Sequence, residues 1–266
     1  MLLPLWPDRP LEQDEPNVGC PSLTPYLLDG PGPFPLVIVV PGGGYARRAP
    51  HEAEPIARWL NLLGVAAVVL NYRVHPFQHP IPLQDGLRAV RMVRHYAQEW
   101  HVDPQRIGML GFSAGGHLTA TVGTHFDAGS ANAADPIERQ SSRPDLLILC
   151  YAVISFGVFA HSGSRTMLLG EGQHDQELIA NLSNETQVSR QTPPTFLWHG
   201  VDDASVPVEN SMLFAAALRR HQVPFALHLF PQARHGLGLA EGNPAVEWTR
   251  LCAVWLAQQW PDHTAR

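Results

Sequence analysis

The chain has 266 residues, 45% of them hydrophobic, and 24 acidic against 18 basic side chains give a formal net charge of −6 at pH 7. This length suffices for one large domain with a substantial core. The negative charge argues against nucleic acid as a partner, and no basic cluster is longer than 47–48 or 219–220. No apolar run approaches the length of a membrane span, so no membrane partner is predicted either.

The first 35 residues are rich in Pro, Gly and acidic residues, which predicts an extended arm with one strand at 23–28. The first eight residues lack a basic region, and Pro4 and Pro7 interrupt them, so we predict no signal peptide. The expected location is therefore cytoplasmic, and a leader removed before residue 1 stays an alternative.

Apolar runs alternate along the rest of the chain with segments in which apolar residues recur at helical spacing. A continuous β-branched run is typical of a strand buried on both faces of a parallel sheet, and helical spacing indicates an amphipathic helix. We predict strands at 36–40, 65–70, 107–110, 146–151, 195–200 and 225–230, and helices at 52–63, 83–100, 113–124, 209–221 and 245–260. The last helix should bury Trp248, Leu251, Val254 and Trp255.

Two polar segments interrupt this alternation. Residues 126–144 read as a surface insertion, and residues 155–192, irregular with short helical patches, could cover the active site as a small lid. No linker divides the chain, so a single domain over 1–266 is expected.

Alternating strands and helices predict an α/β fold with a mainly parallel, doubly wound sheet and right-handed crossovers. In such sheets, ligands bind at the carboxyl ends of the strands. The distinctive glycine-rich and polar segments of this chain follow five of the predicted strands, so we expect one site at that edge.

The segment 111–115 reads Gly-Phe-Ser-Ala-Gly, between a predicted strand and a predicted helix. This G-x-S-x-G pattern places a serine on a strained strand-to-helix turn, with its hydroxyl exposed above the helix N-terminus. Ser113 is therefore the candidate nucleophile. The alternative interpretation is a glycine-rich turn that only packs the helix against the sheet.

A serine hydroxyl needs a base to take its proton and a third group to orient that base. His235, after the last strand, is the candidate base, and His199 is the rival. The acid is Asp202 or Asp203, in the turn after the strand 195–200; we favour Asp203 because Val206-Pro207 would anchor the turn. The order Ser, Asp, His is the one expected for an α/β-hydrolase.

Backbone N–H groups that bind an oxyanion are expected from Gly43, Gly44 and Ala114, because glycines let a backbone approach a ligand closely. Tyr45, which follows these glycines, is a candidate substrate contact. The glycine loop lacks the Gly-Lys-Ser/Thr ending of a phosphate loop, and the three cysteines show no metal-ligand spacing. We therefore expect neither a metal nor a cofactor. Cys150 and Cys252 are expected in the core.

With these stretches in view, the chain resembles the α/β-hydrolase-fold serine esterases of the acetyl-esterase or acetylxylan-esterase-like group, related to the hormone-sensitive-lipase type. The stretches that carry the resemblance are 41–45, 71–73, 111–118, 202–210 and 235–238. The chain departs from many relatives at Pro41, where they carry His in His-Gly-Gly-Gly. The resemblance implies Ser113, Asp203 and His235 as a catalytic triad, with a small or absent lid.

The function expected from these residues and this resemblance is hydrolysis of short acyl esters, acetyl esters of carbohydrates such as acetylated xylan oligomers among them, through an acyl-serine. The alternatives are an amidase or peptidase of the same fold, of the kynurenine-formamidase or prolyl-oligopeptidase type. A catalytically silent binding module is a more remote one. The oligomeric state does not follow from the sequence.

Overall fold

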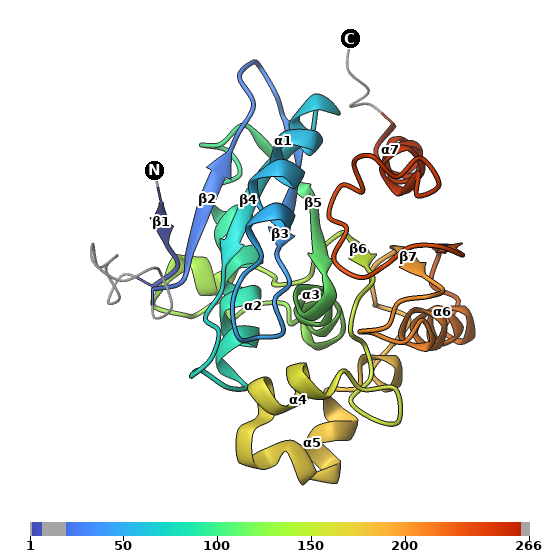
Figure 1. Ribbon diagram of the computed structural model, residues 1–266. Coiled ribbons are helices and arrows are strands. Elements are labelled where there is room, and N and C mark those ends of the chain that lie inside the picture. The colour runs from blue at the N-terminus through green and yellow to red at the C-terminus, as the bar shows by residue number, and fades with distance from the viewer. Residues whose placement is uncertain (1, 7–19, 262–266) are drawn as a thin grey trace.

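An eight-stranded sheet runs through the computed structural model, which describes residues 2–6 and 20–261 (Figure 1). The strands are β1 (Leu3–Pro4), β2 (Ser22–Tyr26), β3 (Phe34–Val40), β4 (Ala66–Asn71), β5 (Val102–Phe112), β6 (Leu146–Cys150), β7 (Thr195–Gly200) and β8 (Phe225–Phe230). Their order across the sheet is β1-β2-β4-β3-β5-β6-β7-β8. Strand β1 pairs antiparallel with β2, and β2 pairs antiparallel with β4. The six strands from β3 to β8 are parallel to one another. The predicted mainly parallel α/β fold is confirmed.

Helices cover both faces of this sheet. The side chains of α1 (Glu54–Leu62) and α7 (Trp248–Gln259) share one apolar core with one face of the strands. Those of α2 (Ile81–His95), α3 (Ser113–His125) and α6 (Glu209–Arg220) share a second core with the opposite face. Both faces of the central strands are therefore buried, as continuous β-branched runs require.

A small helical segment lies beyond the end of the sheet from which α3 begins (Figure 1). It comprises α4 (Ser162–Leu169) and α5 (Gln176–Asn181), with the 3₁₀ turns η3 (Gly170–His174) and η4 (Asn184–Thr186). These elements account for most of the predicted insertion 155–192. The insertion 126–144 is irregular apart from the 3₁₀ turn η2 (Pro136–Arg139).

Several predicted boundaries were wrong. The helix predicted at 83–100 ends at His95, because the chain turns at 96–101 while Ala97 and Trp100 still reach the core and prolong the apolar pattern. The last helix begins at Trp248, and Val254 on it is 53% exposed. Strand β5 begins at Val102, five residues before the predicted strand, with a register irregularity against β3.

The N-terminal arm is described only in part. The predicted strand at 23–28 is present as β2, and a two-residue strand that the sequence did not indicate, β1, pairs with it. The rest of the predicted arm up to residue 20, positions 7–19, lies outside the described residues.

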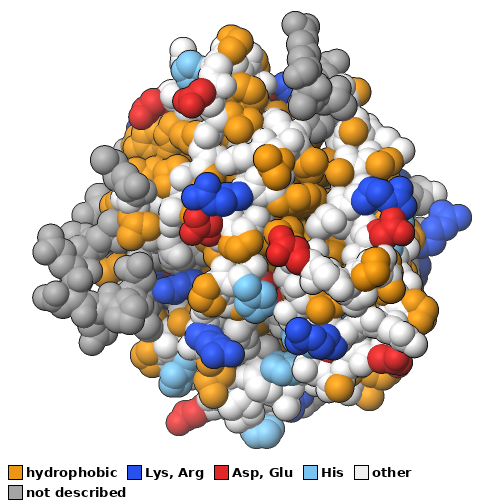
Figure 2. Space-filling model, turned by 45° about the horizontal axis from the view of Figure 1, so that its top comes forward, with side chains coloured by type: hydrophobic (Ala, Val, Ile, Leu, Met, Phe, Trp, Pro, Cys, Tyr) orange, Lys and Arg blue, Asp and Glu red, His pale blue; other side chains and the backbone are white. Residues whose placement is uncertain are grey.

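On the face that Figure 2 shows, basic side chains lie apart from one another, and several adjoin an acidic side chain. Within residues 2–6 and 20–261, none of the helices combines the length and the apolar content that crossing a bilayer requires. Cys150 and Cys252 are buried in the sheet-and-α7 core, as predicted.

Candidate active site

Ser113 lies at the junction of β5 and α3, where the strand becomes a helix without an intervening loop. Its backbone φ is +51°, a left-handed conformation that costs a non-glycine residue free energy and that clusters at functional sites. The turn is tight: a Cβ added to Gly115 would lie 2.3 Å from the carbonyl oxygen of Val40 on β3. The helix therefore passes so close to the sheet that only glycine fits at this position.

The side chains of Ser113, His235 and Asp203 form one hydrogen-bonded line. The hydroxyl Oγ of Ser113 is 2.8 Å from Nε2 of His235, and Nδ1 of His235 is 2.6 Å from Oδ2 of Asp203. The carboxylate is fully buried, while the imidazole is 22% exposed. Three residues that lie far apart in the sequence are thus brought together at the carboxyl ends of β5, β7 and β8.

The second oxygen of Asp203 anchors the carboxylate to its own turn. Oδ1 accepts the backbone N–H groups of Ser205 at 2.8 Å and Val206 at 2.9 Å. Burial raises the pKa of Asp203, but hydrogen bonds from His199, His235 and the Val206 amide outweigh it, so the pKa lies well below its usual value. Asp203 is therefore an anion at neutral pH, whereas the adjacent Asp202 is exposed to solvent.

His199, the rival candidate for the base, contacts the Asp203 carboxylate. Its ring is buried, with Nδ1 2.8 Å from the Ser211 hydroxyl and Nε2 3.0 Å from the carbonyl oxygen of Val206. Nε2 is also 3.5 Å from Oδ2 of Asp203. His199 thus contacts both the carboxylate and the turn that holds it. His235 is the imidazole that reaches Ser113.

The loop after β3 passes directly beside Ser113, since a Cβ added to Gly42 would lie 3.0 Å from Cβ of Ser113. The carbonyl oxygen of Gly42 accepts the N–H of Ala49 at 2.9 Å, and that of Gly43 accepts the N–H groups of Ala46 and Arg47 at 3.1 and 3.2 Å. In a trans peptide the N–H points away from the carbonyl of the preceding residue. The N–H groups of Gly43 and Gly44 therefore face away from the 46–49 turn. Gly43 has a φ of +128°, and a Cβ there would lie 2.3 Å from the Arg47 carbonyl oxygen.

Ala114 is the second residue of α3 and is fully buried. The first N–H groups of a helix have no carbonyl partner within the helix and form a partial positive charge at its N-terminus. The amide of Ala114 is therefore a donor next to Ser113.

Comparison with known proteins supports one family. The BD-FAE family profile matches residues 28–218. The chain belongs to the BD-FAE family.

Two curated relatives and one solved structure illustrate how this BD-FAE chain compares with known proteins. It is 36% identical over 249 residues to "Endo-1,4-beta-xylanase B" of Butyrivibrio fibrisolvens, covering 92% of this chain and 39% of the relative. It is 36% identical over 207 residues to "Acetylxylan esterase" of Xylanibacter ruminicola, covering 76% and 41%. The chain thus spans about two fifths of the length of these two relatives.

The solved structure is an acetyl ester-xyloside bifunctional hydrolase from Caldicellulosiruptor lactoaceticus. The BD-FAE chain is 54% identical to it with a TM-score of 0.92, and the match covers 97% of this chain and 96% of that one. This likeness supports the α/β-hydrolase resemblance over nearly the whole length of the chain.

Tyr45 does not have the position expected of a substrate contact. It is 1% exposed, and its hydroxyl is 2.8 Å from Nδ1 of His117 on α3. Its φ of +59° turns the side chain inward, against the ring of Tyr72. We therefore correct the expectation: in this BD-FAE chain Tyr45 packs the glycine loop onto α3, and His117 is a structural histidine.

Replacing Tyr45 by phenylalanine should consequently lower stability and leave substrate binding unchanged. The exchange removes the hydroxyl partner of a buried histidine nitrogen, a loss of about 1–3 kcal/mol in the free energy of unfolding. Urea unfolding and the KM for p-nitrophenyl acetate measure the two effects. A several-fold rise in KM at unchanged stability would restore Tyr45 as a substrate contact.

Two residues near the site were not indicated by the sequence. Glu52 is buried beside the glycine loop and accepts the N–H of Gly42 at 2.8 Å. Tyr151, immediately after β6, packs against the ring of His235 with the ring centroids 4.8 Å apart. Glu52 and Tyr151 contact each other across 99 positions of the sequence, so no local sequence pattern indicates their roles.

The segment 155–192 approaches the site through His161. Burial lowers the pKa of His161, and the neighbouring His235 lowers it further, while Asp203 acts in the opposite direction. His161 also caps α4 by accepting the N–H of Ser164 at Nδ1, 3.1 Å away. The role of this segment as a lid stays a prediction.

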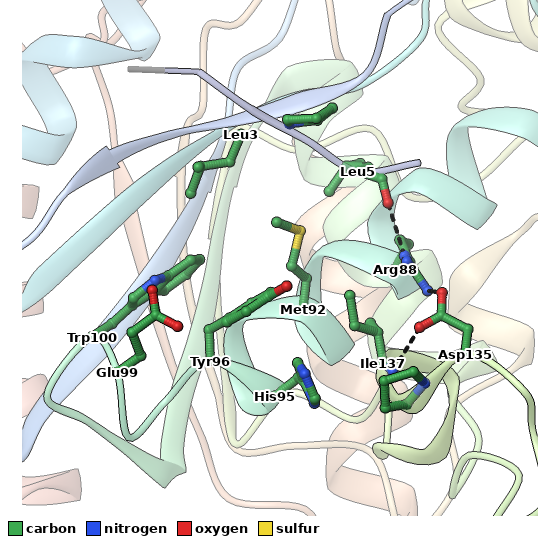
Figure 3. A pocket seen from close by; sticks show the side chains of 12 residues that line it. Leu3, Leu5, Arg88, Met92, His95, Tyr96, Glu99, Trp100, Asp135 and Ile137 are labelled. Carbon is green, nitrogen blue, oxygen red and sulfur yellow. Dashed lines mark hydrogen bonds and ion pairs between the residues drawn. The ribbon is translucent and has the colours of Figure 1, made fainter. Parts of the chain in front are cut away.

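A cavity of about 650 Å³ lies elsewhere, between β1, α2 and η2 (Figure 3). Arg88 lies at one side of it, hydrogen-bonded to the Leu5 carbonyl oxygen and paired with Asp135. Met92 and Tyr96 also line the cavity. None of its lining residues belongs to the Ser113 site. Among the described residues, no group of three His, Cys, Asp or Glu side chains is arranged to hold a metal ion.

Proposed function

We propose that this chain is a serine carboxylic-ester hydrolase that acts on short acyl esters, in particular acetyl esters of carbohydrates such as acetylated xylan oligomers. The observation that carries the proposal is the continuous line of hydrogen bonds from the Ser113 hydroxyl through His235 to Asp203. Such a line is what a hydroxyl needs in order to lose its proton as it attacks a carbonyl carbon.

In the proposed reaction, Nε2 of His235 takes the proton of Ser113 while Oγ attacks the carbonyl carbon of the ester. Asp203 keeps the proton of the neutral imidazole on Nδ1 and stabilises the imidazolium that forms. The imidazolium then returns the proton to the leaving alcohol, which leaves an acyl-Ser113. Water attacks this acyl group with His235 again as base, and the carboxylic acid is released.

The negative charge on the carbonyl oxygen would be stabilised by the N–H groups of Gly43, Gly44 and Ala114. Two observations support this assignment. The donors come from two elements that meet at Ser113, and the carbonyls of Gly42 and Gly43 are already engaged within their own loop. Donors that are held in place before the charge develops cost no reorganisation in the transition state.

The acetylated-carbohydrate substrate is suggested by the names of the relatives. One is an acetylxylan esterase, and the solved structure at 54% identity is an acetyl ester-xyloside bifunctional hydrolase. The amidase and peptidase alternatives share the same catalytic residues, so the acyl donor itself has to be tested.

We expect a kcat/KM for p-nitrophenyl acetate at least tenfold above that for p-nitrophenyl decanoate, together with release of acetate from acetylated xylo-oligosaccharides. One preparation is assayed against both esters, the oligosaccharides, N-formylkynurenine and a dipeptidyl amide, with Ser113→Ala as the blank. Faster turnover of the formyl amide or the peptide amide than of every ester would assign the chain to the amidase or peptidase class.

A further inference from the structure

Glu52, in the 3₁₀ turn η1 (Pro50–Glu52), is an acidic residue that is only 2% exposed. Among the described residues, its ion-pair partner is His51, 3.6 Å away, whose own side chain is 56% exposed. Burying a carboxylate without a buried cation costs several kcal/mol unless hydrogen bonds satisfy its oxygens. The partners of these two oxygens therefore matter.

One oxygen of Glu52 holds the glycine loop. Oε2 accepts the N–H of Gly42 at 2.8 Å. A Cβ added to Gly42 would lie 2.8 Å from this oxygen and 3.0 Å from Cβ of Ser113, so Gly42 is wedged between the carboxylate and the nucleophile. The two residues that follow Gly42 are the proposed oxyanion donors Gly43 and Gly44. Their distance from Ser113 thus depends on the position of Glu52.

The other oxygen of Glu52 reaches the loop that carries the base. Oε1 accepts the O–H of Tyr151 at 2.6 Å, and the Tyr151 oxygen accepts the N–H of Gly238 at 2.9 Å. Gly238 lies three residues beyond His235, whose ring packs edge to face on Tyr151. Both oxygens of Glu52 therefore act as acceptors, the pattern of an ionised carboxylate.

We propose that Glu52 is a positioning residue. Through Gly42 on one side and Tyr151 on the other, it holds the glycine loop, residues 42–44, at a fixed distance from the loop 235–238, with Ser113 between them. This inference rests on the proposed esterase function. The carboxylate does not touch the reacting atoms. It joins the loops that follow β3 and β8, which a second contact also links, from Nε2 of His51 to the Gly236 carbonyl oxygen at 3.1 Å.

We expect the hydrogen bonds that connect Gly42, through Glu52 and Tyr151, to Gly238 to affect the transition state more than the bound substrate. Oxyanion donors interact more strongly with the tetrahedral intermediate than with the ground-state carbonyl, and a displacement of about 1 Å at a reacting group can cost about 100-fold in rate. Loosening the two loops should therefore lower kcat and leave KM nearly unchanged. A carboxylate with a purely structural role would instead affect stability and leave kcat alone.

The experiment compares Glu52→Ala, Glu52→Gln and Tyr151→Phe with wild type, using kcat, KM and Tm with p-nitrophenyl acetate. The matched control is Glu54→Ala, which removes an exposed glutamate two residues away that pairs with Arg58. Glutamine keeps both links, because its amide oxygen can accept the Gly42 N–H while its NH₂ donates to the Tyr151 oxygen. Alanine keeps neither.

We expect Glu52→Ala to lower kcat at least tenfold with KM within twofold, Glu52→Gln to retain kcat within about threefold, and Glu54→Ala to match wild type. Tyr151→Phe should lower kcat several-fold, and the double variant Glu52→Ala/Tyr151→Phe should be no slower than Glu52→Ala, because both act in one chain of contacts. If Glu52→Ala does not fold, Glu52→Gln and Tyr151→Phe carry the test by themselves.

A kcat of Glu52→Ala or of Tyr151→Phe within twofold of wild type would overturn the proposal, as would a Glu52→Gln variant that is as slow as Glu52→Ala. Ser113→Ala, assayed in parallel, separates this failure from that of the proposed function. If Ser113→Ala is inactive while both Glu52→Ala and Tyr151→Phe are as fast as wild type, only the positioning role is wrong. If Ser113→Ala is itself active, the esterase proposal fails first.

Discussion

Replacing Ser113 by alanine is expected to lower kcat for p-nitrophenyl acetate by about 10⁴- to 10⁶-fold. Without the hydroxyl no acyl-serine can form, and the proton that His235 would accept is absent. What remains is the stabilisation of a direct water attack by the oxyanion donors, which in triad enzymes leaves a rate still above that of water alone. Steady-state release of p-nitrophenol measures this loss.

The matched control is Ser205→Ala, which removes an exposed serine hydroxyl from the Asp203 turn and leaves the Ser205 N–H in place. It should keep kcat within twofold. Because Ser113 and His235 act as a unit, the double variant Ser113→Ala/His235→Ala should be about as slow as either single variant. A fluorophosphonate should label wild type on Ser113 and leave Ser113→Ala unlabelled; a Ser113→Ala enzyme with a near wild-type rate would refute the assignment.

The parallel sheet could be predicted from the sequence because several of its strands are buried on both faces and consist of uninterrupted apolar runs. Residues 36–40 and 146–150 lie within such runs, and both lie in observed strands. Ser113 could also be identified, since Gly111 and Gly115 are required by the close packing of α3 on β5 and on the end of β3. These constraints are local, and each of them produces a pattern in a short stretch of consecutive residues.

The sequence did not predict contacts between residues that lie far apart along the chain. Glu52 follows Gly42 by ten positions, yet its second partner, Tyr151, is 99 residues away, and no periodicity links them. Tyr45 was misjudged for the same reason. Its place beside Gly44 indicated a contact with substrate, whereas its backbone φ and its partner His117, 72 residues on, turn it into the interior.

The exchange Asp203→Asn should lower kcat by about 10³- to 10⁴-fold, whereas Asp202→Asn should leave it within twofold. The reason lies in the two N–H groups of Ser205 and Val206 that Oδ1 of Asp203 accepts. An asparagine must keep its oxygen toward these donors, so its NH₂ faces Nδ1 of His235. The imidazole then accepts at Nδ1 and carries its proton on Nε2, facing Ser113, where it cannot take the serine proton.

The pH dependence of the free energy of unfolding provides a second test of the variants Asp203→Asn and Asp202→Asn. A carboxyl whose pKa is depressed in the folded protein contributes stability above its unfolded pKa, about 3.9, and loses it as the pH falls through the folded pKa. The pKa of Asp203 is depressed in this way. Wild type should therefore exceed Asp203→Asn in the free energy of unfolding by the largest amount near neutral pH, and the difference should shrink below about pH 4. Urea titrations at each pH measure this difference. Asp202→Asn, at an exposed site, should follow wild type throughout.

The activities of the two variants decide which acid orients His235. An inactive Asp202→Asn beside an active Asp203→Asn would transfer the orienting role to Asp202 and contradict the line of contacts from which the esterase mechanism was built.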